Sequence, residues 1–432
     1  MNSTLAMIIL AAVATVPAGG AEPLRRRADL GFAAGRFTPG EGLMVARVAP
    51  GTAAARAGLL AGDRLLGIGA RTFTTGLDAD AGMAALRSGE RVTLRLTRGG
   101  VALALPVVLE AMPLDDMPEV EFSYEEIRNP RSGERQRVIV SRPRGTATRL
   151  PAVFFIPWLS CDSVEAAPGA RGGIETLLYR IASESGLVLM RVEKPGVGDS
   201  EGVCSETDLD TELAGNRAAF EALKRHPWVD PARVVAMGQS FAGGLLPLVA
   251  PREETHGYLF LNSWVRTWLE RLLEFERRRL EAAGLSAGDV STRMRRLAEL
   301  YGLVLEGGLT PAEASRRKPE LGPVWEDAPA HQYGRPIRFL QQLQATNVSA
   351  AWEKVDRPTL AVFGEADLVM SRSDHERVVA LVNRNRPGAA RLLTVPGMDH
   401  GLSAPLPGGG EGLPEVVATT VLDWLRRVAG SP

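Results

Sequence analysis

Five short, almost continuous apolar runs constrain the fold of this chain more than any other feature. A strand that is buried on both faces reads as a continuous apolar run, whereas a strand with one solvated face alternates. Helical patterns separate the runs, so the sequence predicts an α/β fold with a mostly parallel sheet covered by helices on both faces. Ligands of such sheets bind beyond the carboxyl ends of the strands. The runs are residues 151–156, 187–192, 233–237, 258–261 and 359–363.

Ser240 follows one of these runs, in the sequence Gly238-Gln239-Ser240-Phe241-Ala242-Gly243-Gly244. A strand, a sharp turn with serine at its apex and a helix form a nucleophile elbow, which lifts the hydroxyl clear of the sheet. Small residues at positions 238, 242 and 243 allow the strand and the helix to approach closely. The common pattern has glycine two places after the serine, where this chain has Ala242. We predict that Ser240 is a nucleophile.

His400 fits the role of general base better than the other histidines of the chain. A serine hydroxyl is a poor nucleophile until a neighbouring base takes its proton. His400 lies in a loop after the strand-like residues 391–395 and is the last histidine, as the chain order Ser–Asp–His requires. His375 lies in a charged helical segment, which is typical of a solvated face. The remaining three are His226 and His256, which we expect to be structural, and His331, which we expect near a pocket.

Asp367 is the candidate that would orient the imidazole and stabilise its charged form. It lies in the loop after the run 359–363, at the edge of the sheet where the site is expected. Asp374 and Asp399 are the rival candidates, and Glu365 is a minor one. Asp399 is adjacent to His400 in sequence, and such neighbours rarely face each other side-on.

With these motifs, residues 120–430 resemble an α/β-hydrolase. The run Glu193-Lys194-Pro195-Gly196-Val197-Gly198-Asp199-Ser200-Glu201-Gly202 resembles the turn that shapes the rim of the site in that family. The resemblance implies a serine hydrolase with the triad Ser240, Asp367 and His400, and a covalent acyl-enzyme.

The same resemblance implies an oxyanion hole made of two backbone amides. The first is the amide of Phe241, directly after the nucleophile. The second comes from Ile156-Pro157-Trp158-Leu159-Ser160, where the sequence departs from the usual His-Gly form. Proline has no N–H and cannot donate, so we expect the Leu159 amide, with Trp158 as the alternative.

The first part of the chain, residues 27–109, has a different pattern of short strands, glycines and two short helical stretches. It resembles a PDZ domain, through Val48-Ala49-Pro50-Gly51-Thr52-Ala53-Ala54 and through Ala61-Gly62-Asp63-Arg64-Leu65-Leu66-Gly67-Ile68. Leu30, Gly31 and Phe32 match the carboxylate-binding loop of that family. Glycine between two apolar residues lets consecutive amides cradle an anion, and a peptide C-terminus can then add as a strand to the sheet edge. The alternative is a structural module whose groove is filled by its own chain.

Two further segments complete the domain organisation. Residues 110–119 are polar and acidic with two prolines, which indicates a linker. From about residue 264 to 350 the apolar spacing becomes helical, so we expect a helical cap over the active site that sets substrate choice. The arginines at 277–279 and 295–296 in this segment either contact acidic substrates or, more simply, form a solvated helix face.

Both cysteines lie near the expected site: Cys161 follows the oxyanion loop and Cys204 follows the rim turn. We predict that they form a disulfide in an oxidising compartment. In the chain-entropy model, a bridge of this span contributes on the order of 3–4 kcal/mol. Two cysteines are too few for a disulfide scaffold or a four-thiolate zinc site.

Residues 1–21 read as a signal peptide, because an apolar run at 5–16 precedes small residues at Gly19 and Ala21. This run is shorter than the roughly 20 residues of a transmembrane helix, and no later stretch reaches that length. The first four residues carry no lysine or arginine, so a misassigned start or a buried N-terminal helix is the alternative. We therefore expect an exported protein, periplasmic or secreted.

These features predict an exported serine hydrolase that cleaves an acyl ester, carboxylesterase-like, with no cofactor and no metal. Its partners would be a small-molecule acyl substrate and, at the PDZ groove, a peptide C-terminus. The formal net charge of −1 gives no electrostatic basis for nucleic-acid binding. A serine peptidase of the same fold is the second hypothesis within enzymes, and a non-catalytic PDZ scaffold protein is the third hypothesis.

Overall fold

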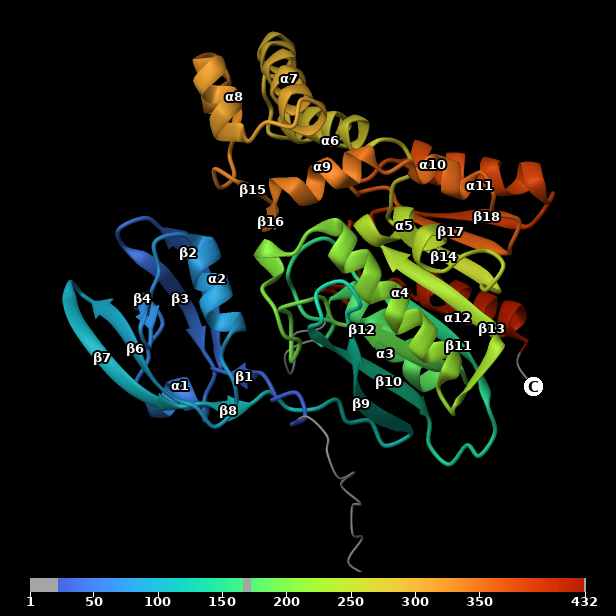
Figure 1. Cartoon of the computed structure of the whole chain (residues 1–432), viewed down its shortest axis with the longest axis horizontal. Coiled ribbons are helices and arrows are strands. Elements are labelled where there is room, and N and C mark those ends of the chain that lie inside the picture. Colours follow the sequence, from blue (N-terminus) through green and yellow to red (C-terminus); the bar gives the residue numbers. More distant parts are fainter. Residues whose placement is uncertain (1–21, 166–171, 431–432) are drawn as a thin grey trace, which may run out of the picture.

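The computed structural model describes residues 22–165 and 172–430 (Figure 1). The predicted signal peptide, residues 1–21, lies outside the described residues. Two parts follow one another: a small β-rich N-terminal module and a larger α/β part that carries a layer of additional helices.

An eight-stranded sheet forms the centre of the larger part, in the order β9-β10-β12-β11-β13-β14-β17-β18. The pairs β9–β10 and β10–β12 are antiparallel, and every other neighbouring pair in this sheet is parallel. The prediction of a mostly parallel sheet is therefore confirmed. The strands are β9 (Val120–Arg128), β10 (Arg135–Pro143), β11 (Leu150–Ile156), β12 (Val188–Val192), β13 (Val229–Gln239), β14 (Gly257–Leu261), β17 (Thr359–Gly364) and β18 (Ala390–Val395).

Helices cover both faces of this sheet, as its continuous apolar strands require. Along β11, Phe154 packs into one core while Val153 and Phe155 pack into the other, because successive side chains point to opposite faces. The first core is closed by α4 (Leu209–Arg225), α5 (Phe241–Val249) and α11 (Arg372–Asn385). The second is closed by α3 (Gly173–Glu184) and α12 (Glu415–Ala429).

The segment between β14 and β17 forms the predicted helical layer, drawn at the top of Figure 1. Its first helix, α6 (Trp268–Ala282), starts with a capping box in which Thr267 and Glu270 satisfy each other's backbone amides. The apolar stripe of this helix joins the core on the α4 and α5 side of the sheet. The others are α7 (Ala287–Tyr301), the π-helical turn η2 (Gly302–Glu306), α8 (Pro311–Arg317), the 3-10 turn η3 (Pro319–Val324), the short strands β15 (His331–Gln332) and β16 (Arg335–Pro336), α9 (Ile337–Ala345) and α10 (Val348–Trp352).

The N-terminal module has its own sheet and its own hydrophobic core. The strand order is β2-β3-β4-β6-β7, with β5 paired to β4. The predicted linker begins as a strand, because β8 (Glu110–Ala111) pairs with β1 (Ala28–Asp29), so the chain enters and leaves the module side by side. The elements are β2 (Phe32–Thr38), β3 (Gly42–Val48), α1 (Ala53–Arg56), β4 (Arg64–Ile68), β5 (Arg71–Thr72), α2 (Gly76–Ala84), β6 (Arg91–Arg98) and β7 (Val101–Val108).

A buried group of charges joins the module to the larger part. Asp199, in the rim turn after β12, accepts hydrogen bonds from the Arg27 amide at 2.8 Å, from Arg26 at 3.2 Å and from Arg137 at 3.1 Å. Arg26 also forms a two-pronged ion pair with Glu165, with both distances 2.7 Å. Since these charges are desolvated and mutually paired, they hold the two parts in one orientation.

No helix in the described part of the chain is long and apolar enough to span a membrane.

Candidate active site

Ser240 occupies a strained turn between β13 and α5, as predicted for a nucleophile elbow. Its φ of 58° and ψ of −125° lie where residues with a side chain are uncommon. Strand and helix approach closely: a Cβ on Gly238 would lie 2.8 Å from the Gly243 nitrogen, and one on Gly243 would lie 2.4 Å from Ser263 Oγ. The close approach of strand and helix therefore requires glycine at positions 238 and 243. Position 242, where the common pattern has glycine, accepts the small Ala242 side chain in the buried first turn of α5.

The structure brings Ser240, His400 and Asp367 into one hydrogen-bonded chain. His400 Nε2 lies 2.8 Å from Ser240 Oγ, and His400 Nδ1 lies 2.8 Å from Asp367 Oδ2. The other carboxylate oxygen of Asp367 accepts the Val369 and Met370 amides at 2.7 and 3.0 Å, which fixes its orientation. A base within reach of the hydroxyl and a buried carboxylate behind that base are the parts that general-base activation of serine requires.

The rival carboxylates have other partners. Asp374 pairs with Arg266 at 3.0 Å and accepts the Val265 amide. Asp399 accepts the amide of Ser403 inside the histidine loop. Glu365 lies at the surface, 3.7 Å from Arg372.

The expectation of a solvated face for His375 is wrong. The ring is buried and lies between two backbone groups: Nδ1 is 2.8 Å from the Ser371 carbonyl, and Nε2 accepts the Ser263 amide at 3.0 Å. Burial lowers the pKa of His375 to about 4. The charged neighbours in the sequence misled the prediction, since Arg372 and Glu376 are exposed on α11 whereas Asp374 is buried together with His375.

Two side chains that the sequence reasoning missed hold the histidine loop. Asn262, directly after β14, donates to the carbonyls of Asp399 and His400 at 2.8 and 3.2 Å and accepts the Gly364 amide at 2.8 Å. Gln239 donates to the His400 carbonyl at 2.9 Å. Asn262 has a φ of 37°. Its position at the carboxyl end of an apolar run is the signal that marks it, as it marks Ser240.

Two of the three predicted oxyanion donors, Trp158 and Leu159, line the same cavity as Ser240. Phe241 is the first residue of α5, where a helix leaves its amides without acceptors in the helix. Trp158 and Leu159 follow β11, and both border the cavity, whose volume is about 460 Å³. Either amide remains a candidate for the second donor.

A disulfide joins Cys161 to Cys204, as predicted. It ties the loop after β11 to the rim turn, at the 3-10 turn η1 (Cys204–Glu206). Arg335 donates to Cys204 Sγ at 2.7 Å and to the Cys204 carbonyl at 3.0 Å. The bridge therefore restrains the loop after β11, which lines the cavity beside Ser240.

The helical layer supplies the far wall of the cavity. Trp268, Arg271 and Phe275 come from α6, and Tyr333 comes from the turn between β15 and β16. Arg271 is a residue that the sequence reasoning did not single out. Of the five arginines that it did consider, Arg295 and Arg296 are exposed. The other three form ion pairs: Arg277 with Glu281, Arg278 with Glu274, and Arg279 with Glu276 and Glu326.

Residues 23–109 match the family model described as PDZ domain. The N-terminal module is a PDZ domain. No curated protein matches the chain in sequence.

Among solved structures, Est1E from Butyrivibrio proteoclasticus with bound ferulic acid is 16% identical, with a TM-score of 0.47, and the match covers 70% of this chain and 98% of that one. An esterase from the hyperthermophilic archaeon Pyrobaculum calidifontis is 17% identical, with a TM-score of 0.44 and coverage of 72% and 86%. The α/β-hydrolase GrgF from Penicillium sp. sh18 is 18% identical, with a TM-score of 0.45 and coverage of 72% and 99%.

The predicted carboxylate loop of the PDZ domain carries an acidic side chain of its own. Asp29 Oδ1 accepts the Gly31 amide at 2.7 Å. Gly31 has a φ of 70°, and a Cβ there would overlap Thr52, so only glycine fits. Leu30 is buried in the domain core, and Phe32 pairs with Val48 at the start of β2. One of the three predicted amides is therefore already engaged by a negative charge.

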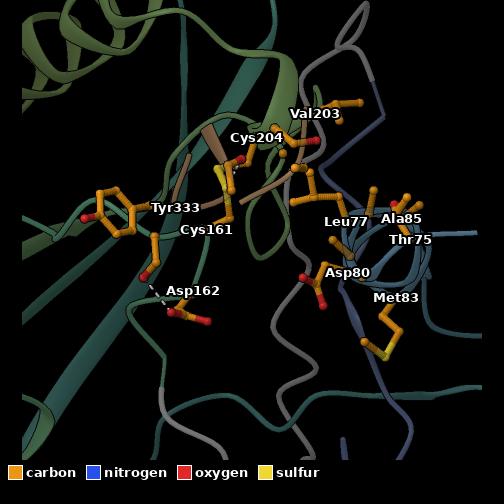
Figure 2. A pocket seen from close by; sticks show the side chains of 18 of the residues that line it. Thr75, Leu77, Asp80, Met83, Ala85, Cys161, Asp162, Val203, Cys204 and Tyr333 are labelled. Atoms are coloured by element: carbon orange, nitrogen blue, oxygen red, sulfur yellow. Dashed lines mark hydrogen bonds between the residues drawn. A yellow bond between two sulfur atoms is a disulfide. The ribbon is translucent and has the colours of Figure 1, made fainter. Parts of the chain in front are cut away.

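The PDZ helix α2 faces the larger part across a cleft of about 680 Å³ (Figure 2). Leu77 and Asp80 project from α2 towards the Cys161–Cys204 bridge. Burial, with the charge of Asp162 across the cleft, raises the pKa of Asp80. The cleft and the cavity beside Ser240 share three lining residues, Ser160, Asp162 and Tyr333, so the two spaces adjoin.

Proposed function

We propose that the chain is an exported serine hydrolase that cleaves an acyl ester. The observation that carries this proposal is the chain of hydrogen bonds from Ser240 through His400 to the buried Asp367. It lies at the carboxyl edge of a parallel sheet and borders a cavity of about 460 Å³, which is enough for a small acyl compound.

In the proposed reaction, Ser240 Oγ attacks the ester carbonyl carbon while His400 Nε2 takes the hydroxyl proton. The carbonyl oxygen becomes an oxyanion that accepts hydrogen bonds from the Phe241 amide and from the Leu159 or Trp158 amide. When the C–O bond breaks, the alcohol leaves with the proton from His400. Water then attacks the acyl-enzyme, His400 takes its proton, and the acid leaves as that proton returns to Ser240.

Asp367 keeps the imidazole in the tautomer that has its free nitrogen towards Ser240, and it stabilises the imidazolium that forms in each step. Asn262 and Gln239 support the same geometry by holding the backbone of His400. Nothing in this mechanism needs a cofactor, since acyl transfer to serine is complete with these groups.

A serine peptidase is the second candidate, and the adjoining cleft favours it. A substrate that extends from Ser240 past Tyr333 would contact the PDZ helix α2, and an extended peptide has the length for this. A PDZ groove that recruits a peptide C-terminus would work in the same direction, although Asp29 weakens that role by engaging the Gly31 amide.

Export is supported by the Cys161–Cys204 bridge, because disulfides persist in oxidising compartments. Mass determination of the exported protein tests this part: a mature N-terminus at Glu22 is expected, and an intact Met1 on exported material contradicts cleavage.

Labelling with a fluorophosphonate probe tests the nucleophile. We expect the native protein and a Ser373→Ala control, whose serine lies exposed on α11, to become labelled, whereas Ser240→Ala should not. A panel of esters and peptides then separates the two enzyme hypotheses, and a protein that is neither labelled nor active leaves the scaffold hypothesis.

A further inference from the structure

Among the residues that the structure describes, Arg271 is a buried cation without an anionic partner. Four arginines of the described chain are buried, and the other three each form an ion pair: Arg137 with Asp199, Arg191 with Asp115, and Arg335 with Glu212. Arg271 is 4% exposed, forms no ion pair within the described residues, and has no hydrogen-bond partner for Nε or Nη1.

Burying a cation without a partner costs free energy, so other groups must stabilise the charge of Arg271. The acidic residues nearest to Arg271 on α6 have other partners. Glu270 accepts the hydrogen bonds of the capping box from Thr267. Glu274 pairs with Arg266 at 2.6 Å, and Glu276 pairs with Arg279 and accepts the Tyr301 hydroxyl. Aromatic rings surround the guanidinium instead: its carbon lies 4.7 Å from the ring centre of Trp268, 5.0 Å from that of Phe275 and 6.0 Å from that of Tyr333. These rings hold the guanidinium in place and stabilise its charge, and the Tyr333 hydroxyl hydrogen-bonds with it, but none of them supplies the negative charge of a carboxylate.

Arg271 lies where this charge can reach a substrate of Ser240. Arg271 lines the same cavity as Ser240 and His400. Its neighbour Tyr333 is one of only four non-glycine residues with positive φ in the described chain, the others being Ser240, Asn262 and Leu402. Those three form the nucleophile elbow and the support of the histidine loop, so strained backbone in this protein is concentrated at the site. Burial raises the pKa of the Tyr333 hydroxyl, and the charge of Arg271 and a hydrogen bond with it partly oppose that rise.

We propose that Arg271 binds a carboxylate of the substrate, so that the enzyme prefers esters whose acid or alcohol part carries a free carboxylate. This inference rests on the proposed function, because the ester carbonyl must reach Ser240. The planar guanidinium matches a carboxylate with two parallel hydrogen bonds, which fixes both charge and orientation. Two acidic residues also line the cavity, and neither is buried as Arg271 is. Asp162 is exposed and accepts a hydrogen bond from Ser160, and Glu175 is half-buried in the first turn of α3.

Two matched substrate pairs test the proposal and separate the acid side from the alcohol side. Monoethyl adipate is compared with ethyl 6-methylheptanoate, in which an isopropyl group replaces the carboxylate. The acetate ester of 4-hydroxybutanoate is compared in the same way with 4-methylpentyl acetate. We expect the native enzyme to favour the anionic member of at least one pair, and Arg271→Met to lower that preference roughly ten- to hundredfold, the size of a charge-assisted hydrogen bond to a buried cation.

Arg271→Lys keeps the charge but loses the fork, so it should give an intermediate preference. Arg277→Met is the matched control on the same helix, because Arg277 is exposed and paired with Glu281, and it should keep the native preference. Thermal unfolding of Arg271→Met verifies the fold, and its midpoint should be no lower than that of the native enzyme because an unpaired buried charge is removed.

Binding to an inactive enzyme makes the test independent of catalysis. Calorimetric titration of Ser240→Ala with the two anionic esters should show binding of one of them, weakened at least tenfold in Ser240→Ala/Arg271→Met. Equal affinity of the two proteins, or no binding of either ester, overturns the proposal for Arg271. Loss of the proposed function is read separately, as an absence of fluorophosphonate labelling at Ser240.

Discussion

Replacing both bridged cysteines, Cys161→Ala/Cys204→Ala, should destabilise the larger domain by an amount that the chain itself sets. The bridge spans a sequence separation of 43 residues. In the chain-entropy model, closing a loop of this size removes about 13 cal/mol/K from the unfolded chain, which is about 4 kcal/mol at 25 °C. For a domain of roughly 300 residues, an unfolding entropy of about 2.1 cal/mol/K per residue converts this loss into a fall of about 6 °C in Tm.

Activity should fall as well, because the bridge restrains the loop that carries Trp158 and Leu159. Both candidates for the second oxyanion donor lie within three residues of Cys161. A displacement of about 1 Å at a reacting group lowers rates by roughly a hundredfold, so we expect kcat for an ester to fall between about tenfold and a hundredfold.

Differential scanning calorimetry of four samples measures the stability change: the native protein, the native protein with dithiothreitol, the double variant, and the double variant with dithiothreitol. Ser205→Ala, next to Cys204 in η1, controls for substitution at this turn. The reduced native protein and the double variant should agree, and dithiothreitol should leave the double variant unchanged.

A fall in Tm of less than 1 °C in the double variant would refute the reasoning, because the loop length would then not determine the contribution of the bridge. A further fall when dithiothreitol is added to the double variant would show that the reductant acts elsewhere than on this bond.

Three other predictions follow from the site and from the domain contact. Asp367→Asn should lower kcat for an ester by about 10³- to 10⁴-fold, whereas the surface variant Glu365→Gln, the control, should keep it. Steady-state kinetics would contradict the triad if the two variants had the same kcat. Burial lowers the pKa of His375 from 6.5 to about 4. As the pH falls, the unfolded chain therefore binds a proton at this histidine before the folded chain does. The contribution of the neutral ring to the free energy of unfolding should be complete above pH 6.5 and should fall by about 3 kcal/mol as the pH drops to 4. Urea unfolding across this interval measures that fall, and His375→Gln should flatten it by about one proton, with an unchanged slope counting against the assignment. Asp199→Asn should weaken the contact between the PDZ domain and the larger domain. A glutamate-specific protease should then cleave at Glu110 and Glu119 roughly tenfold faster, the factor that a loss of about 1.4 kcal/mol gives. Equal cleavage rates in Asp199→Asn and in the exposed control Asp423→Asn would rule out this role.

Much of the fold and the order of the site residues could be read from local sequence. Continuous apolar runs mark strands that are covered on both faces, and glycines at 238 and 243 mark the close approach that a nucleophile elbow needs. The positions of Ser240, Asp367 and His400 just after strands predicted that they would meet, because parallel strands end at one edge of the sheet.

Local sequence could not reveal roles that depend on distant partners. His375 looks exposed among its charged neighbours, yet Arg266, which is more than a hundred residues away, pairs with the adjacent Asp374 and helps to bury that segment. Asn262 and Gln239 act through the backbone of a loop that lies more than a hundred residues further along the chain. An Asn or Gln in isolation carries no sign of such a contact.

The sequence by itself determined the strands, the elbow and the PDZ domain, because periodicity, turn chemistry and burial patterns act over a few residues. Only the tertiary structure decided which aspartate faces His400 and that Asp199 joins the two domains. It also decided that Arg271 is, in the described part of the chain, the buried arginine without a carboxylate partner. The physical reason is that electrostatic pairing depends on distances between segments far apart in the chain, and these are set only when the sheet and the helical layer have packed together.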